Sequence, residues 1–406
     1  MIVHRHASCG LLGGILTGVM LASPLFARAQ AVPSDPIPAT ASAAAETSSW
    51  WRGITTNGYL SLSYSYNPAD PVPRINEFRV FDFNANDPQL DVAQLVVQHP
   101  VREPKQFGFK VNLMAGSGVP EVTAAYGMFR DTQTGIAHHF DIPEVYLSYI
   151  VPVGKGLRVD LGKFVTPFGY EVIGGYDGYN DNFSRSFLFG YGVPFTHTGL
   201  KTSYSFSPKI SAAWMITNGS DAVAPLNTGV TFGGQLSATP SKAYTITFTL
   251  VHGPERPHND HDQRSLYELT GTWSPRPSLT LGLDALYADE DHAATNGSDA
   301  IWRGFAGYTK YKVTKSFSFA FRGEVFRDGG GSRTGVDQLL ESYTLTPEYD
   351  LPASFSRLSS KFKRIDGKFA IRGEFRKDHS DQAAFREGTG FSNQQFTTAI
   401  NLVYLF

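Results

Sequence analysis

The chain has 406 residues, with 18% charged and 13% aromatic side chains and a formal net charge of −2. This charge gives no reason to expect a nucleic-acid partner, and the slightly negative mean hydropathy excludes a bundle of transmembrane helices. The 40 glycines and the many aromatic residues suit short strands joined by turns, so any membrane-spanning fold has to be a closed β-barrel.

The amino-terminal segment has the three parts of a secretory signal. Arg5 precedes an apolar stretch, Leu11–Phe26, and small residues that include Ala29 and Ala31 follow it. A basic start, a short apolar core and a small-residue cleavage site are typical of a signal peptide. We therefore expect residues 1–31 to direct export, with cleavage after Ala31 or Ala29.

The single cysteine and the segment after the signal bear on the exported chain. Cys9 precedes the apolar core, so it is not a lipid acceptor and is removed with the signal. The mature protein then has no disulfide and no thiolate chemistry. Residues 32–49 are rich in Ala, Pro and Ser and predict a flexible leader. Residues 50–406 remain for the folded domain.

The folded domain shows a period of two rather than a helical period. Apolar and polar residues alternate in about sixteen segments, which predicts strands with one apolar face. The expected strands are 56–66, 89–99, 105–115, 142–152, 156–165, 195–206, 208–217, 228–239, 241–252, 264–274, 277–288, 300–312, 316–327, 337–349, 366–377 and 395–406.

The last expected strand, 395–406, decides between a soluble and a membrane fold. Its apolar and polar residues alternate up to the terminal residue, Phe406. About a dozen tilted residues span a bilayer, and a strand in hydrocarbon has to pair on both sides, so its partners must close into a barrel. A final strand that ends in Phe also resembles the signal by which the outer-membrane assembly machinery recognises its substrates.

The lengths of the connections alternate between long and short along the chain. Long connections are expected at 67–88, 116–141, 166–194, 253–263, 289–299 and 378–394, with short turns between most of the others. A connection around 350–365 is longer than this rule predicts. The pattern predicts an all-β, transmembrane, antiparallel up-and-down barrel of about sixteen strands, with long external loops and short periplasmic turns. A soluble sandwich has no reason to separate its loops by length.

Several stretches resemble a known family. They include Arg79-Val-Phe-Asp-Phe, Gly162-Lys-Phe-Val-Thr-Pro-Phe-Gly-Tyr-Glu, Asn182-Phe-Ser-Arg-Ser-Phe-Leu-Phe, Pro194-Phe-Thr-His-Thr-Gly and Arg372-Gly-Glu-Phe-Arg-Lys-Asp. Across essentially the whole mature chain, the sequence resembles the OmpL-like putative beta-barrel porin-2 family. This resemblance implies an outer-membrane barrel that conducts solutes, and it specifies the fold more firmly than the substrate.

The third long connection, 166–194, is the candidate constriction. A barrel of sixteen strands is too wide to discriminate between solutes without one. The connection is rich in aromatic residues, which would form an unusual apolar patch if exposed to water. Its charged candidates are Glu171, Asp177, Asp181 and Arg185. Alternatively, the connection packs over the barrel mouth or against a neighbouring subunit.

The late strands carry further candidates for the pore. Alternation points Arg322, Glu324, Arg372, Glu374 and Arg376 inward. These residues either set a local field across the pore from the acidic loop or form salt bridges that brace the wall. Under the first hypothesis, reversing the three arginine charges should shift ion selectivity toward cations. The inward charges as a whole are nearly balanced, which predicts no strong ion preference.

Other chemistries have weaker support in the sequence. His252, His258 and His261 lie in a polar segment without a recognised metal-ligand spacing, and no nucleophile motif surrounds His197. We expect no metal, no cofactor and no enzymatic activity. The predicted function is passive diffusion of small hydrophilic solutes or ions, with a closed or plugged structural or adhesive barrel as the alternative. Expected partners are outer-membrane lipid and, by analogy with general porins, two further copies in a homotrimer.

Overall fold

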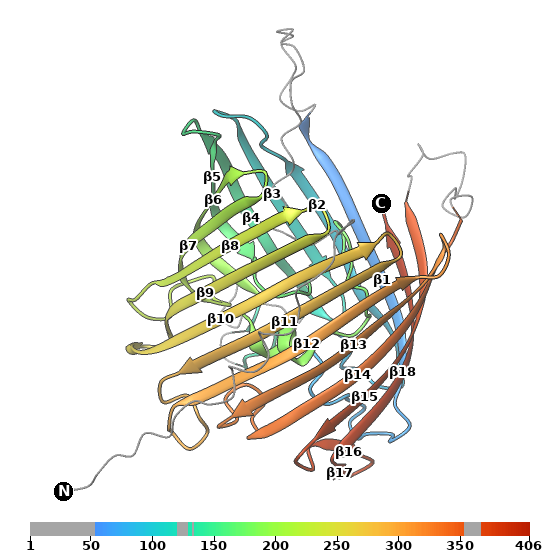
Figure 1. Ribbon diagram of the computed structural model, residues 1–406. Helices are drawn as coiled ribbons and strands as arrows, with labels where there is room; N and C mark the ends of the chain where they lie inside the picture. Colours follow the sequence, from blue (N-terminus) through green and yellow to red (C-terminus); the bar gives the residue numbers. More distant parts are fainter. Residues whose placement is uncertain (1–52, 120–128, 132–133, 353–366) are drawn as a thin grey trace, which may run out of the picture.

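The computed structural model describes residues 53–119, 129–131, 134–352 and 367–406. The expected signal peptide and leader lie outside these residues. Within the described part of the chain, sixteen antiparallel strands close into one barrel, and β16–β17 form a separate two-stranded hairpin (Figure 1). The predicted barrel is therefore confirmed.

The strands follow one another around the barrel in chain order. Their bounds are β1 Thr55–Tyr66, β2 Pro88–His99, β3 Phe107–Ala115, β4 Phe140–Val151, β5 Leu157–Val165, β6 Thr196–Ser207, β7 Ile210–Ser220, β8 Thr231–Ser241, β9 Tyr244–Arg256, β10 Asn259–Arg276, β11 Leu279–Glu290, β12 Ala300–Lys312, β13 Phe317–Gly329, β14 Gln338–Asp350, β15 Lys368–Ser380, β16 Phe385–Glu387, β17 Gly390–Ser392 and β18 Gln394–Leu405. One short π-helix, η2 (Leu188–Gly192), lies between β5 and β6. In the described ranges no helix is long and apolar enough to cross a bilayer.

The last strand closes the barrel against the first. β18 pairs with β1 in a register that places Tyr64 opposite Ile400. The pairing continues to the terminal residue: the Gly58 N–H donates to the Phe406 carbonyl (2.8 Å), and the Phe406 N–H donates to the Gly58 carbonyl (3.1 Å). A Cβ on Gly58 would lie 2.0 Å from the Phe406 ring. A side chain at position 58 would therefore displace the Phe406 ring from the seam.

The two faces of the wall differ as the alternation predicts. Large apolar side chains such as Leu147 (65% exposed), Phe248 and Ile400 point outward, where they would contact lipid. Serine, threonine and charged side chains point inward, as Ser61 and Thr247 do. Because one face of every strand meets hydrocarbon, the register of each strand is strongly specified.

The β9–β10 connection is shorter than the sequence predicts. The expected long loop 253–263 is instead the end of a hairpin, because β9 continues to Arg256 and β10 begins at Asn259. Pairing continues outward through Gly253–Arg264 and Pro254–Gln263. His258 adopts a positive φ of 58° at the turn. Local side-chain bonds such as Asn259 Nδ2 to Asp262 (2.9 Å) support the extension.

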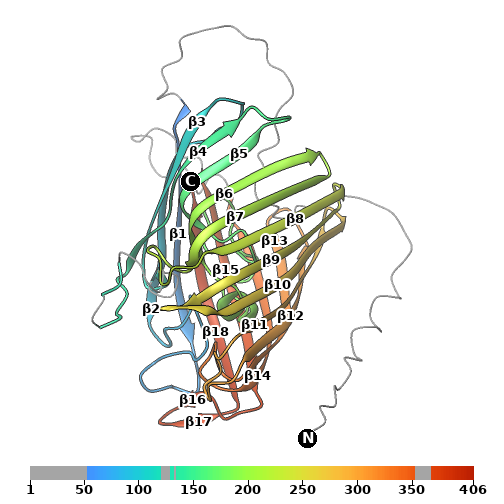
Figure 2. The same cartoon turned by 90° about the vertical axis from the view of Figure 1, so that its left-hand side faces the viewer.

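The two ends of the barrel differ in the length of their connections. The β6–β7, β8–β9 and β10–β11 turns are two residues each, at the end where the carboxyl terminus lies. The longer connections, and the β16–β17 hairpin, are at the other end (Figures 1 and 2). The exceptional β14–β15 connection contains residues 353–366, outside the described ranges. Two of the long connections extend into the barrel.

Candidate pore constriction

The third loop (residues 166–194) starts along the inner wall of β10 to β12. The Gly169 N–H donates to Glu268 Oε2 (2.8 Å), and the Tyr170 N–H donates to Asp284 Oδ2 (3.4 Å). The Tyr170 ring stacks on Tyr308 of β12, with the ring centroids 4.1 Å apart. Both acceptors are inward carboxylates in the wall, so the loop turns into the barrel at its first residues.

The tip of the third loop reaches the other side of the barrel. The N–H groups of Gly175 and Tyr176 both donate to Gln94 Oε1 of β2 (3.0 and 3.2 Å). Lys110 Nζ of β3 donates to the Tyr176 hydroxyl (2.6 Å). Because β2 and β3 lie across the barrel from β10 and β11 in the strand order, the loop crosses the interior.

The returning part of the loop contacts lysines near the short-turn end. Lys310 Nζ of β12 donates to Asp181 Oδ1 (2.6 Å), and Lys368 Nζ of β15 donates to the Tyr179 hydroxyl (2.9 Å). Lys310 and Lys368 both lie near the ends of their strands that face the short turns. The tip therefore descends deep into the barrel rather than covering its mouth.

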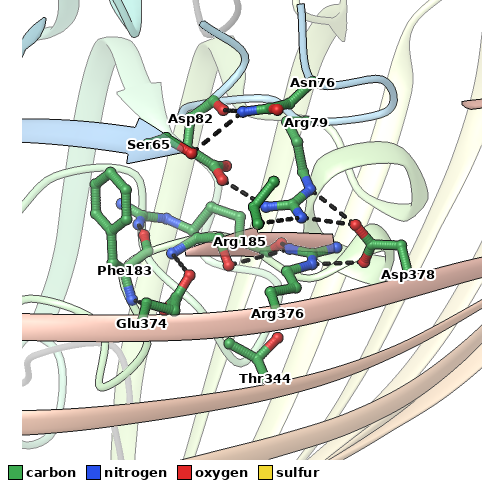
Figure 3. Close-up of polar contacts among 12 residues, drawn as sticks. Ser65, Asn76, Arg79, Asp82, Phe183, Arg185, Thr344, Glu374, Arg376 and Asp378 are labelled. Atoms are coloured by element: carbon green, nitrogen blue, oxygen red, sulfur yellow. Dashed lines mark hydrogen bonds and ion pairs between the residues drawn. The ribbon is translucent and has the colours of Figure 1, made fainter. Parts of the chain in front are cut away.

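Glu374 of β15 holds the loop where it turns back toward β6. Its Oε2 accepts from the Phe183 N–H (2.6 Å), and its Oε1 accepts from the Ser184 N–H (3.0 Å). The Thr346 hydroxyl of β14 donates to the same carboxylate (2.8 Å). A carboxylate has enough lone pairs to accept all three bonds, and Glu374 is only 3% exposed. Figure 3 shows the carboxylate beneath Phe183.

Two wall arginines bind the carbonyl side of the same segment. Arg322 Nη1 of β13 donates to Glu171 Oε1 (2.8 Å) and to the Ser184 carbonyl (2.7 Å). Arg376 Nη1 of β15 donates to the Arg185 carbonyl (2.6 Å). Each guanidinium presents several donors in a fixed plane, which suits a cluster of carbonyls and carboxylates. The wall thus satisfies both the donors and the acceptors of the loop backbone.

Arg185 of the third loop turns back onto the loop itself. Its Nε donates to the Val172 carbonyl (3.1 Å), and its Nη1 donates to the Phe183 carbonyl (2.9 Å). Its guanidinium lies over the Phe81 ring, 4.4 Å from the centroid. Burial lowers the pKa of Arg185, while nearby Glu171 opposes this shift. Arg185 acts as an internal brace of the loop.

The comparison with protein families identifies the chain. A family model described as "Putative beta-barrel porin-2, OmpL-like" matches residues 53–406. The chain belongs to this family. It is therefore an outer-membrane β-barrel of the porin type, a family of channels rather than of enzymes. A search of curated proteins gives no match.

Solved structures share the fold of this porin at low sequence identity. The outer-membrane channel DcaP of Acinetobacter baumannii is 9% identical, with a TM-score of 0.54 over 87% of this chain and 97% of that one. An anion-selective porin from Comamonas acidovorans is 10% identical (TM-score 0.53; 87% and 99% covered). A Salmonella typhi OmpF complex with daunomycin is 12% identical (TM-score 0.52; 87% and 97% covered). At these identities the likeness shows the fold alone.

The nine candidate residues of this porin fall into two groups. Seven gather where the third loop meets the wall of β13 and β15, namely Glu171, Arg185, Arg322, Glu324, Arg372, Glu374 and Arg376. The wall members and Glu171 are at most 6% exposed. Asp177 is exposed at the tip, and the Asp181 side chain is 37% exposed beside Lys310. A role of these residues in a constriction stays a prediction.

Sequence reasoning missed several residues that hold the loop. Gln94, Lys310 and Lys368 contact the third loop directly, but nothing in their local sequence distinguishes them from other inward polar residues. In the first loop (residues 67–87), the sequence offers only the family-like stretch that begins at Arg79. The 21 residues of this loop include only three aromatics, close to the chain average of 13%, so the signal that singled out the third loop is absent from it.

Among the residues that the structure covers, no three His, Cys, Asp or Glu side chains are grouped to hold a metal ion. The segment with His252, His258 and His261 instead forms the strand ends and turn of the β9–β10 hairpin. His197 is fully buried and lies against the rings of Phe164 and Phe168. Its Nε2 also lies 3.3 Å from the Thr166 hydroxyl, which fits a packing role at the loop end.

Proposed function

We propose that this porin passes small hydrophilic solutes and ions by passive diffusion and that the third loop sets the width of its pathway. The observation that carries the proposal is the span of the loop. It binds Gln94 and Lys110 on one side of the barrel and Asp284 and Lys310 on the other. A segment that crosses the interior divides a wide lumen into narrower passages.

The exposed charges at the tip are the ones that a passing ion would meet. Of the nine candidates, Asp177 and Asp181 retain exposed side chains. Lys310 (21% exposed) pairs with Asp181, and Lys368 (45% exposed) donates to the nearby Tyr179 hydroxyl. Acids and lysines in close alternation give a small net field, so the selectivity between cations and anions is weak. The buried arginines of the wall are already bonded to the loop and serve to hold it.

The test is the single-channel conductance of the refolded protein in a planar bilayer with a salt gradient. Discrete ohmic steps support the channel, and the reversal potential reports the ion preference. Asp177→Asn with Asp181→Asn removes two exposed charges and should shift the reversal potential toward anion preference. Asp70→Asn, an exposed acid of the first loop, serves as the matched control. An unchanged reversal potential in the double variant would exclude the tip from the pathway.

A closed barrel with a structural or adhesive role is the second candidate. The observation that favours it is the burial of the wall under the loops, with Arg322, Asp378 and Thr344 at 0% exposure. Conductance separates the two functions. A protein that inserts as a heat-resistant barrel but gives no steps has a plugged lumen.

We further propose that residues 1–31 export the chain and that the mature protein assembles as a homotrimer in the outer membrane. The basic and apolar pattern of the amino terminus supports the first part, and the size of the barrel, by analogy with general porins, supports the second. Amino-terminal sequencing of the outer-membrane protein should begin at Val32 or Gln30. Chemical cross-linking of the membrane-embedded protein should yield a trimer and would contradict the proposal if it gave monomer alone.

A further inference from the structure

The first loop (residues 67–87) also enters the barrel, and the proposed function assigns it no role. Its middle segment, Phe78–Asp82, lies inside. Arg79, Val80, Phe81 and Asp82 are 4%, 7%, 5% and 6% exposed. Figure 3 shows Arg79 and Asp82 lying together with Arg376 and Asp378 of β15. A buried, charged loop segment has to be paired with charge, and its partners indicate what it does.

Arg79 binds the wall through Asp378. Its Nη2 and Nε both donate to Asp378 Oδ2 (2.6 and 3.1 Å), and Nη2 also donates to the Thr397 hydroxyl of β18 (3.1 Å). Its Nη1 donates to Asp82 within the same loop (2.5 Å). Burial opposes the charge of Arg79, but Asp378 and Asp82 outweigh this effect and raise its pKa. The guanidinium is therefore charged, and each of its three nitrogens donates at least one hydrogen bond.

The same carboxylate holds the arginine that binds the third loop. Arg376 Nε donates to Asp378 Oδ1 (2.7 Å), the oxygen that Arg79 leaves free. Arg376 Nη1 then donates to the Arg185 carbonyl (2.6 Å) and to the Ser184 hydroxyl (3.1 Å). Asp378 thus takes one arginine on each oxygen, and this fixes the plane in which Arg376 meets the third loop.

The first loop also packs directly on the third. The Phe81 ring lies under the Arg185 guanidinium, and it meets Phe195 edge-on with the ring centroids 6.4 Å apart. Val80 lies against Gly190 so closely that a Cβ at position 190 would be 2.6 Å from Val80 Cγ2. Contacts through both charge and packing join the two loops over one stretch of wall.

We infer that the first loop is a clamp that holds the third loop across the lumen, with Arg79 as its positioning residue. Arg79 orients Arg376 through Asp378, while Val80 and Phe81 press on the third loop from the side. Without Arg79, Asp378 Oδ2 keeps only the Gln395 amide as a donor (3.2 Å), and the carboxylate draws Arg376 away from the Arg185 carbonyl. The inference rests on the proposed role of the third loop as the constriction, and its test separates the two claims.

The release of the third loop can be measured without reference to transport. Ser184 is fully buried, and Ser184→Cys in a Cys9-free chain gives a single thiol beneath the clamp. In this background Arg79→Ala should raise the rate of labelling by a maleimide more than about tenfold, because the buried Asp82 loses its ion pair with Arg79 and Asp378 keeps only its pair with Arg376. Arg79→Lys keeps the charge and should give a smaller rise. Arg74→Ala removes an exposed arginine of the same loop, 59% exposed, and should change nothing.

A disulfide between the first and third loops should reverse the effect of Arg79→Ala. A Cβ at position 190 lies 3.6 Å from Val80 Cβ, within the range that a disulfide requires. Val80→Cys with Gly190→Cys should therefore cross-link under oxidation. In the Arg79→Ala background this lock should return single-channel conductance to the wild-type value, and a reductant should abolish the return. Failure of the pair to cross-link in the folded wild-type barrel would overturn the packing of the two loops.

The outcomes distinguish the clamp from the constriction. Unchanged labelling in Arg79→Ala overturns the clamp. Faster labelling together with larger conductance supports both claims. Faster labelling with unchanged conductance supports the clamp and rejects the third loop as the constriction. Heat-modifiable migration in gels shows for each variant that the barrel has closed.

Discussion

Glu374 is the side chain whose loss should release the third loop most directly. Its carboxylate accepts the consecutive N–H groups of Phe183 and Ser184 and the hydroxyl of Thr346. Glu374→Ala leaves two buried backbone donors without acceptors. Each such donor costs about 1–3 kcal/mol, so the bound position of the loop should lose about 2–6 kcal/mol. Glu374→Gln should lose nearly as much, because its amide group has one acceptor oxygen and turns a donor toward the second N–H.

Limited proteolysis measures this release. A loss of about 2 kcal/mol raises the population of the released loop roughly 30-fold. The cleavage rate rises in the same proportion when the loop opens and closes faster than the protease cuts. Chymotrypsin should cut the variant near Phe183, with the site identified from fragment masses. Glu290→Ala is the matched control, because Glu290 is also buried on the inner wall but pairs with Arg264 of the neighbouring strand. Equal cleavage rates in both variants would refute the reasoning.

Three further changes probe other parts of the barrel. Asp221 Oδ1 accepts the N–H groups of Phe195 and its neighbour (2.8 and 2.9 Å), and burial raises its pKa despite these bonds. The contribution of Asp221 to stability should therefore fall as the pH rises from the ordinary pKa of an aspartate through the raised pKa. Asp221→Asn removes the buried charge, so its melting temperature, measured by gel shift at pH 7, should equal or exceed that of the wild type. Gly58→Val pushes the Phe406 ring aside and should lower the temperature at which heating changes the gel migration, whereas Thr55→Val at the exposed start of the same strand should not. Tyr170→Ala removes a stacked ring, worth about 0.5–1.5 kcal/mol beyond its buried area, and should speed proteolysis at the start of the third loop.

The strands could be predicted closely because the bilayer imposes one rule on each of them. The expected strand 300–312 coincides with β12, and 89–99 differs from β2 by one residue. Lipid on one side and polar side chains on the other leave little freedom of register. The rule weakens outside the membrane. Gly253 and Pro254 suggested a loop, whereas β9 continues past both, where pairing no longer depends on the lipid.

The site could be predicted in its residue types but not in its contacts. The sequence singled out both Arg322 and Glu171, although they were expected on opposite sides of a pore. They instead bond each other across 151 residues of chain. Loops have no period from which the direction of a side chain follows, so neither this contact nor the entry of the first loop could be read from the sequence.

The tip of the third loop, residues 174–179, can be removed without removing the residues that attach the rest of the loop to the wall. The Asn180 side chain bonds both the N–H and the carbonyl of Val172, so the residues on either side of 174–179 lie close together. Replacing 174–179 by two glycines therefore removes the part that reaches β2 and β3 and leaves the contacts of Glu171 and Glu374 in place.

Single-channel conductance of the wild-type protein and of this shortened variant tests most directly whether the third loop sets the pathway. Our account predicts larger ohmic steps from the shortened variant, with heat-modifiable migration unchanged. Equal steps from the two proteins would contradict it.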